Sequence, residues 1–433
     1  MGAGSVMRNL SGQQVDASPS VDDVREFYDL LPYPAPISDL DQYRELWLNR
    51  DRSRWLFRLF WPSGSFREDQ DILVAGCGTS QAAKHALREP TARVTAIDIS
   101  EESLRHTRAL KEKYQLDNLD LYQIPIEEVE KLGHSFDKII CTGVIHHLPE
   151  PEIGLRAIRG VLKPEGAVHI MVYAPYGRTG IYMLQDYCRL LGIGTSPTEL
   201  EELGTTLSSL PQDHPLAPLL RQAKDFQHPA ELADALLHPL DRAYTVPQLY
   251  ELLQRCGLSF GRWFEQAPYL PHCGRLADTP HYARLAALTA HSQHAAAELF
   301  RGNMTRHTFI AYRDDQVEET QPIQFNDDQW LGYVPLRVPW GVAIRDGRVP
   351  RGAAAVLINT AHTFNDLLLQ ISPEEDVLFR AIDGESTVEK ILMTTNHREQ
   401  QFEAREFFDR LWRYDQVVFD LSNTESPKLS HNK

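Results

Sequence analysis

From residue 71 to residue 172, short apolar runs alternate with longer amphipathic segments. This alternation is typical of βαβ units, in which a helix connects two parallel strands of one sheet. The sequence therefore predicts a doubly wound α/β sheet in this part of the chain. The apolar runs that we expect to form its strands are 72–75, 94–97, 138–142 and 168–173.

Two segments carry clear signals for helices. After the second run, Ser100 is a suitable N-cap residue, and Glu101 and Glu102 match the positive end of a helix dipole. Residues 24–34 combine apolar and aromatic positions with closing prolines, which predicts a short helix. We expect this second helix to cover a pocket.

Downstream of the sheet the pattern becomes helical and then returns to strands. Residues 175–250 contain amphipathic runs separated by prolines, which predicts a helical insertion in the sheet domain. Strand-like runs recur at 258–264 and 307–312, with an alanine-rich helical stretch at 281–300 between them. We expect these two runs to be late, antiparallel strands of the same sheet.

An acidic, linker-like segment at 314–319 marks a domain boundary. The remainder has its own apolar segments, which predicts a small α+β domain. The expected organisation is a flexible tail at 1–20, a sheet domain at 21–313 with an N-terminal cap at 21–70 and the insertion at 175–250, the α+β domain at 317–421, and a tail at 422–433.

Composition narrows the class of protein. The 433 residues are 42% hydrophobic and 24% charged, as in ordinary globular proteins, and their number favours more than one hydrophobic core. The net charge of −16 repels phosphate backbones, and the basic stretches are interleaved with acids or aromatics, so we expect no nucleic-acid partner.

The five cysteines lie far apart and form no Cys-x-x-Cys pair. This pattern argues against disulfides and against a zinc site, so no metal is expected and a reducing cytoplasm fits best. No stretch approaches the roughly 20 apolar residues of a membrane span, and the first 20 residues lack the pattern of a signal peptide. We therefore expect no membrane partner.

The sharpest chemical signal follows the first predicted strand. Residues 72–79 read Ile-Leu-Val-Ala-Gly-Cys-Gly-Thr, and a side chain at Gly76 or Gly78 would fill the space in which a ligand lies against bare backbone. Twenty residues after Gly78, the second strand ends in Asp98, whose carboxylate can accept hydrogen bonds from both hydroxyls of a ribose. A nicotinamide site would place a third glycine near Gln81, and its absence disfavours that alternative.

A third element lies at the same edge of the predicted sheet. Residues 136–142 form a strand that leads into the loop 143–148, Gly-Val-Ile-His-His-Leu. Together with the glycine turn and Asp98, this loop resembles class I S-adenosylmethionine-dependent methyltransferases, over about residues 24–174. Residues 163–166, Lys-Pro-Glu-Gly, are similar to the Lys-Pro-Gly-Gly turn common in that family, with Glu165 in place of a glycine.

The resemblance implies a Rossmann-like fold with S-adenosylmethionine as the cofactor. It places Gly76 and Gly78 against the methionine part and the ribose, Asp98 on the ribose hydroxyls and Ile99 on the adenine. The implied cofactor-binding residues are Ala75, Gly76, Cys77, Gly78, Asp98, Ile99, Pro125, Ile126, Gly143 and Val144.

Two parts of that set concern the methyl group and the adenine. Gly143 and Val144 would line the wall beside the transferable methyl group. Where the family often has an acid that contacts the adenine amino group, residues 123–127 read Gln-Ile-Pro-Ile-Glu. Backbone atoms or Glu127 would have to replace that contact.

A sulfonium already activates the methyl group, so the protein must chiefly align a nucleophile and exclude water. A general base is needed only when the acceptor must lose a proton. We expect His146, Tyr176 and Arg178 to be the catalytic candidates. The alternatives are that His146 and its neighbour His147 only shape their loop, and that Tyr176 and Arg178 only pack the inserted helices.

Further residues belong to the acceptor side. Tyr28 and Tyr33 either close over the cofactor or join a terminal helix to the sheet. The remaining acceptor-side candidates are Asp186, Asp241, Arg242 and Tyr244.

In the C-terminal domain, residues 374–392 predict a helix, a turn at Asp383 and Gly384, and a second helix capped by Ser386 or Thr387. This segment resembles small winged-helix domains that bind precursor peptides. A stabilising or dimerising appendage is the alternative, and the acidic first helix argues against DNA reading.

The expected function is methyl transfer from S-adenosylmethionine to an unidentified acceptor, a small molecule first and a peptide or protein next. Whether the chain forms a homodimer stays open. The alternatives are a non-catalytic cofactor-binding scaffold or sensor that acts through the C-terminal domain, and a nicotinamide oxidoreductase, which would need a hydride-transfer residue pair that is not recognisable here.

Overall fold

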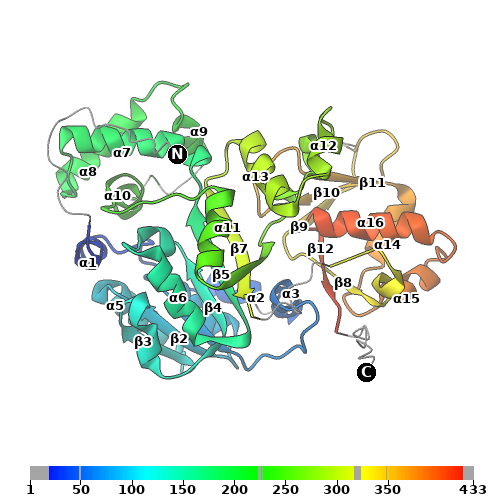
Figure 1. Cartoon of the computed structure of the whole chain (residues 1–433), viewed down its shortest axis with the longest axis horizontal. Coiled ribbons are helices and arrows are strands. Elements are labelled where there is room, and N and C mark those ends of the chain that lie inside the picture. The colour runs from blue at the N-terminus through cyan, green and yellow to red at the C-terminus, as the bar shows by residue number, and fades with distance from the viewer. Residues whose placement is uncertain are drawn as a thin grey trace, which may run out of the picture.

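The computed structural model describes residues 19–47, 50–222, 226, 228–315, 323–347 and 349–422. Most of both predicted tails and of the predicted linker lies outside the described residues. Two units sit side by side, a larger one built on a wide sheet and a smaller one that contains the end of the described chain (Figure 1).

The larger unit contains a seven-stranded sheet of order β3-β2-β1-β4-β5-β7-β6. The first five strands pair in parallel, whereas β7 pairs antiparallel with both β5 and β6. This arrangement confirms the Rossmann-like, doubly wound sheet with two late antiparallel strands. The strands are β1 (Asp71–Ala75), β2 (Arg93–Asp98), β3 (Leu119–Gln123), β4 (Phe136–Thr142), β5 (Leu162–Tyr173), β6 (Leu258–Trp263) and β7 (Arg306–Arg313).

Strand β3 is absent from the strands predicted above. It lies at the edge of the sheet and is half exposed, so its residues lack the continuous apolar run that marks the central strands. The predicted turn at residues 163–166 lies within β5, which begins at Leu162. There the pairing slips, because Phe136 faces Leu162 whereas Lys138 faces Ala167.

Alternate residues of the central strands face two hydrophobic cores. In β1, Leu73 packs with residues of the helices on one face, and Ile72 and Val74 pack with residues of the helices on the other. The first face is covered by α6 (Pro151–Val161) and α11 (Val246–Arg255), and the second by α3 (Arg50–Phe60), α4 (Gln81–Arg88) and α5 (Glu101–Tyr114).

Helix α5 begins as predicted, with the Ser100 hydroxyl accepting a hydrogen bond from the Ser103 backbone N–H. Before the sheet lie α1 (Val21–Leu30), the predicted N-terminal helix, and α2 (Asp41–Trp47). Between β6 and β7 lie α12 (Tyr282–Ala286) and α13 (Ala290–Arg301), where one helical stretch was predicted. The 3-10 helices are η1 (Ile126–Leu132), η2 (Ile145–His147), η3 (Tyr176–Arg178), η5 (Ala267–Tyr269), η6 (Gly274–Leu276) and η8 (Asp328–Gly332).

Four helices after β5 form a separate layer at the carboxyl edge of the sheet (Figure 1). They share an apolar cluster that includes Leu184, Leu203 and Leu232. Helix α11 packs on the sheet instead, although its first residues fall inside the range 175–250 expected for the insertion. The four helices are α7 (Thr179–Leu191), α8 (Pro197–Ser208), α9 (Ala217–Gln222) and α10 (Pro229–Leu237).

The smaller unit has its own core around Phe407, Phe408 and Phe419, as expected of an α+β domain. A three-stranded sheet of order β11-β10-β9 and a two-stranded pair β12-β8 carry three helices. The elements are β8 (Val334–Arg337), β9 (Gly341–Ile344), β10 (Ala355–Asn359), β11 (Leu368–Ile371), α14 (Pro373–Arg380), α15 (Val388–Thr394), α16 (Gln401–Arg413) and β12 (Val417–Asp420).

One contact between the two units lies on α3, and another is the ion pair of Arg301 with Asp366 at 3.0 Å. Trp55 packs edge-on against Trp340 with 4.6 Å between ring centroids. Asp420, at the end of β12, forms ion pairs with Arg58 at 2.9 Å and Arg54 at 3.0 Å, and the Arg58 and Asp420 side chains are almost fully buried. Tyr312 of β7 donates a hydrogen bond to the Phe60 carbonyl at 2.5 Å, which fixes α3 to the sheet.

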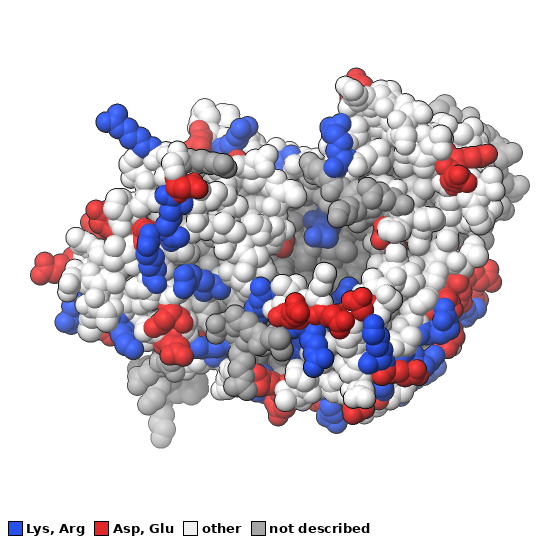
Figure 2. Space-filling model, turned by 180° about the vertical axis from the view of Figure 1, so that it is seen from behind, with Lys and Arg blue, Asp and Glu red and all other residues white. Residues whose placement is uncertain are grey.

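Acidic and basic side chains are interspersed over the face opposite to that of Figure 1, around a hollow near its centre (Figure 2).

Among the helices of the described residues, none combines the length and the apolar character needed to cross a bilayer.

We predict that Asp420→Ala lowers the free energy of unfolding by about 3–5 kcal/mol, because it leaves the buried Arg58 charge without its carboxylate. The measurement is equilibrium unfolding in urea. Glu128→Ala is the matched control, since it breaks an exposed ion pair with Lys131 and should cost less than about 1 kcal/mol. Equal losses in the two variants would contradict the prediction.

Candidate functional site

The glycine turn after β1 brings bare backbone to the carboxyl edge of the sheet. Gly76 and Gly78 have φ of +67° and +54°, a conformation that side chains disfavour. A Cβ at Gly76 would lie 2.3 Å from Val144 Cγ2, and one at Gly78 would lie 2.7 Å from the Tyr33 carbonyl oxygen. Both the conformation and the close approach therefore require glycine.

Asp98 ends β2 beside this turn and is buried. Its two carboxylate oxygens accept hydrogen bonds from the backbone N–H groups of Gly78 at 2.8 Å and Ser100 at 2.9 Å. Burial raises the pKa of Asp98, and the backbone hydrogen bonds oppose that rise. The carboxylate is thus held in one orientation before any ligand arrives.

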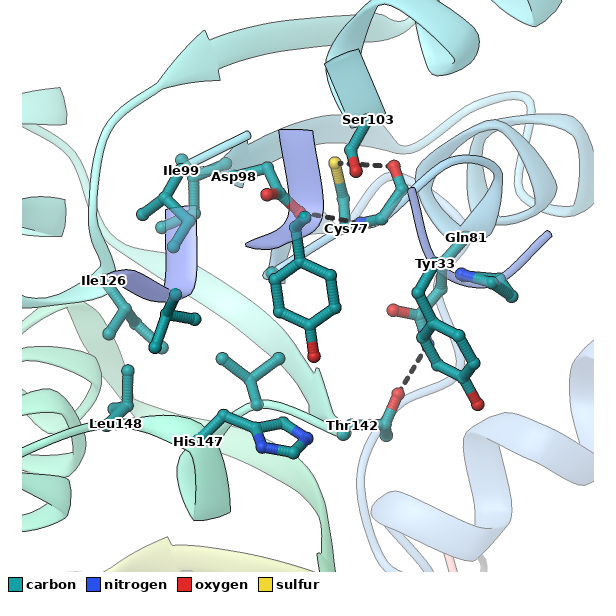
Figure 3. Close-up of a pocket in the computed structure, with 18 of the residues that line it drawn as sticks. Tyr33, Cys77, Gln81, Asp98, Ile99, Ser103, Ile126, Thr142, His147 and Leu148 are labelled. Atoms are coloured by element: carbon teal, nitrogen blue, oxygen red, sulfur yellow. Dashed lines mark hydrogen bonds between the residues drawn. The ribbon is translucent and has the colours of Figure 1, made fainter. Parts of the chain in front are cut away.

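A cavity of about 440 Å³ opens over these residues. Figure 3 shows Ile99, Ile126 and Leu148 at one end and Gln81 and Thr142 toward the other, with Asp98 and His147 on facing walls.

The polar end of the cavity is ordered by a hydrogen bond of 2.6 Å from Gln81 Nε2 to Thr142 Oγ1. Along the cavity, an apolar slot is followed by a carboxylate and then by a polar end. They match the adenine, the ribose diol and the amino-acid part of S-adenosylmethionine, so the residues fit the cofactor that the resemblance implies.

The N-terminal cap closes part of this cavity. Tyr28, Tyr33 and Pro34 are among its lining residues. Thr79 Oγ1 donates a hydrogen bond to the Pro34 carbonyl at 2.7 Å, and Asp29 accepts one from Ser100 Oγ at 2.7 Å. The cap is therefore fixed to the glycine turn on one side and to the start of α5 on the other.

Most of the implied cofactor-binding residues line the cavity. Glu127 lines it too, beside the apolar end where an adenine contact was in question. Ala75 and Pro125 are not among the lining residues. Those that line it are Gly76, Cys77, Gly78, Asp98, Ile99, Ile126, Gly143 and Val144.

The three catalytic candidates lie outside the cavity lining. His146 is fully buried, its ring lies 3.8 Å from that of Tyr173, and neither of its ring nitrogens has a hydrogen-bond partner. Burial lowers the pKa of His146 well below its usual range. Tyr176 is half exposed in η3, and the buried Arg178 is ion-paired with Asp241 at 2.9 Å. None of these three side chains lines the cavity, although His146 and Arg178 pack against the ring of Tyr173, which does.

The other acceptor-side candidates also lie apart from the cavity. Asp186 forms an exposed ion pair with Arg189. Asp241 is occupied by Arg178. Arg242 is exposed, and Tyr244 is buried in the core on which α6 and α11 pack. By contrast, Tyr28 and Tyr33 line the cavity.

Three polar residues near the cavity were missed as a group. His147 lines the cavity, and Asp234 and His238 come from α10 and its C-cap. Asp234 accepts hydrogen bonds from the hydroxyls of Tyr28 at 3.0 Å and Tyr173 at 3.3 Å. The spacing of four residues puts Asp234 and His238 on one face of a helix, but nothing in the sequence places that helix over the sheet.

His147, Asp234 and His238 each have one possible metal-ligand atom, and these three atoms lie within 4.8 Å of one another. At this spacing the three atoms could hold one metal ion. Two of the three residues, Asp234 and His238, already have hydrogen-bond partners. Asp234 accepts two hydroxyls, and His238 Nδ1 accepts the Leu240 backbone N–H at 3.0 Å, which leaves the proton of a neutral ring on Nε2. Asp234 is thus bonded to two tyrosines, and the Leu240 backbone bonds to both histidines, accepting from His147 through its carbonyl and donating to His238 through its N–H.

Known proteins resemble this chain in sequence and in fold. A family model described as a methyltransferase domain matches residues 73–168. An uncharacterized protein of Synechococcus sp. is 31% identical over 250 residues, 55% of this chain and 58% of that protein. A ubiquinone biosynthesis O-methyltransferase of Neisseria meningitidis is 32% identical over 98 residues, 22% of this chain and 41% of that enzyme. The chain thus spans about two fifths to three fifths of these relatives.

A solved structure extends the likeness over both units. PKMT2 from Rickettsia typhi in complex with AdoHcy superposes with a TM-score of 0.61 and 14% identity, covering 90% of this chain and 77% of that one. At this identity the comparison supports the fold. The matched residues 73–168 include the glycine turn, Asp98 and the His-His-Leu loop. This chain therefore carries a class I S-adenosylmethionine-dependent methyltransferase domain.

Proposed function

We propose that the whole protein is an enzyme that transfers a methyl group from S-adenosylmethionine to a small-molecule or peptide acceptor. The observation that carries the proposal is the cavity in which Gly76, Gly78 and the oriented Asp98 carboxylate meet. The methyltransferase-domain match over residues 73–168 supports it.

Different residues of the cavity bind different parts of the cofactor. Asp98 accepts the two ribose hydroxyls, Ile99 and Ile126 hold the adenine, and the polar end at Gln81 and Thr142 takes the amino-acid part. When bound there, S-adenosylmethionine would supply a methyl group that its sulfonium already activates. The cap excludes water while the acceptor is aligned with the reacting bond.

His147 is the residue that we assign to the proton released by the acceptor. Its Nδ1 lies 2.7 Å from the Leu240 carbonyl, which can only accept, so Nδ1 carries the ring proton. Nε2 of the neutral ring then holds a lone pair, and His147 lines the cavity. We prefer His147 to His146 for this role because His146 is sealed beneath Tyr173.

We predict that calorimetric titration detects binding of S-adenosylmethionine and S-adenosylhomocysteine but not of NADH. Asp98→Asn should raise Kd for the first two by about 10- to 100-fold, since hydrogen bonds to a charged acceptor contribute about 1.5–3 kcal/mol. Asp120→Asn on the neighbouring strand β3 is the control, because its side chain is exposed and lies outside the cavity lining. Binding of NADH alone would refute the proposal.

A second prediction concerns pH. Only the ionised carboxylate of Asp98 accepts both ribose hydroxyls, and burial raises its pKa above the usual value. The affinity for S-adenosylhomocysteine should therefore be full above that pKa and fall as the pH is lowered through it. Titrations at a series of pH values should show this loss in the wild type and a flatter profile in Asp98→Asn. The same acid limb in both proteins would show that another group is responsible.

A further inference from the structure

The helical layer places a buried carboxylate behind one wall of the cavity. Asp234 is 3% exposed and lies on α10, outside the matched methyltransferase segment. Both of its oxygens are used, one by the Tyr28 hydroxyl and the other by the Tyr173 hydroxyl. Tyr28 comes from α1 and Tyr173 from the end of β5, so Asp234 joins three separate parts of the chain.

The direction of these two hydrogen bonds determines what the cavity presents. Burial raises the pKa of Tyr28 and of Tyr173 well above 10, so both hydroxyls keep their protons. Each hydroxyl has a single proton, and each donates it to Asp234. The two hydroxyl oxygens can therefore offer only lone pairs to any further partner. Both tyrosines line the cavity.

His147 extends the same wall. Its ring centroid lies 6.3 Å from that of Tyr28 and 5.7 Å from that of Tyr173. In the neutral form of the ring, the Nδ1 proton is directed at the Leu240 carbonyl and Nε2 offers a third lone pair. We call Tyr28, Tyr173 and His147 the lone-pair wall.

The positive charge of Arg178 beside this wall is paired with a carboxylate. Arg178 lies behind Tyr173, with its guanidinium carbon 3.4 Å from the ring centroid, and its charge is paired with Asp241. Gln185 donates a further hydrogen bond to Asp241 at 2.8 Å. This arrangement fixes the Tyr173 ring from behind.

From these contacts we propose that the lone-pair wall, oriented by Asp234, is the methyl-acceptor subsite, and that it selects an acceptor atom carrying hydrogen, an amine nitrogen or a hydroxyl oxygen. This inference rests on the proposed function and names the substrate class of the same site. An N–H or O–H group satisfies the wall. An ether oxygen, a thioether or a carbon nucleophile has no hydrogen that it can donate to the wall. The buried lone pairs of the wall would then have no hydrogen-bond donor. Polar sites reject ligands strongly when buried polar groups are left unpaired in this way.

The test uses three small probes on the full chain saturated with S-adenosylhomocysteine. They are n-butylamine, 1-butanol and diethyl ether, the last two being isomers that differ in whether the oxygen carries hydrogen. Saturation-transfer NMR titrations give the Kd of each probe. The wild type should bind the amine and the alcohol at least about tenfold more tightly than the ether, which corresponds to one net hydrogen bond.

The decisive variant is Asp234→Asn. The amide NH₂ group can donate to one tyrosine, whose own proton then turns toward the cavity, so the preference for 1-butanol over diethyl ether should shrink several-fold. Asp376→Asn is the matched control, because Asp376 is a buried aspartate of the smaller unit that accepts from Arg345 and Arg380. It should leave the preference unchanged.

Tyr28→Phe provides a second variant should Asp234→Asn fail to fold. It removes one acceptor of the wall and should weaken both hydrogen-carrying probes about fivefold while leaving diethyl ether unaffected. Tyr250→Phe is its control, since Tyr250 is bonded to His294 and lies outside the cavity lining.

The outcomes separate the two proposals. If S-adenosylhomocysteine itself does not bind, the proposed function fails and this inference fails with it. If it binds but no probe does, or if diethyl ether binds as tightly as 1-butanol in the wild type, only the acceptor subsite is overturned. An unchanged preference in Asp234→Asn overturns it as well. The amine and alcohol arms, compared with each other, show which of the two acceptor atoms the wall favours.

Discussion

The hydrogen bond from the Gly78 backbone to Asp98 connects the end of β1 to the end of β2. It requires the chain to turn sharply at Gly76 and Gly78, in a conformation that also lets Val144 and the Tyr33 carbonyl come close. The cap can rest on the turn because no side chain projects there. A short stretch of bare backbone thus determines the place of the carboxylate, of the His-His-Leu loop and of the roof of the cavity.

A second constraint comes from burying polar groups outside the sheet. Asp234 can remain in the interior only because two tyrosine hydroxyls satisfy it, and these arrive from the first helix and the fifth strand. The insertion is therefore not an independent lid. Its position is coupled to that of α1, which is itself held by Asp29 on the start of α5.

The sequence was informative where local patterns decide the outcome. The apolar runs of β1, β2, β4 and β5, the Ser100 cap and the glycine turn are features of neighbouring residues, and the structure has them where expected. Strand β3 was not predicted, because an edge strand needs few hydrophobic residues. Whether His147 or His146 faces the cavity depends on the direction in which each residue of the short 3-10 helix η2 points, which composition does not reveal. Asp234 and His238 could not be predicted as site residues, because their role depends on the packing of α10 against distant parts of the chain. Such long-range contacts leave no pattern in the neighbouring residues.

The position of α3 has a consequence for how the molecule is held together. This helix lies early in the chain, yet its arginines bind the carboxylate that ends the last strand, and its Trp55 packs on Trp340 of the smaller unit. Phe60, on the same helix, is fixed to β7 through Tyr312. The chain thus closes on itself, because a helix that precedes the sheet is ion-paired with the last described strand. This joint also unites the two interiors, because Leu336 and Val418 of the smaller unit belong to the same apolar cluster as Val74 of β1, so removing the last strand would expose apolar surface of the sheet unit.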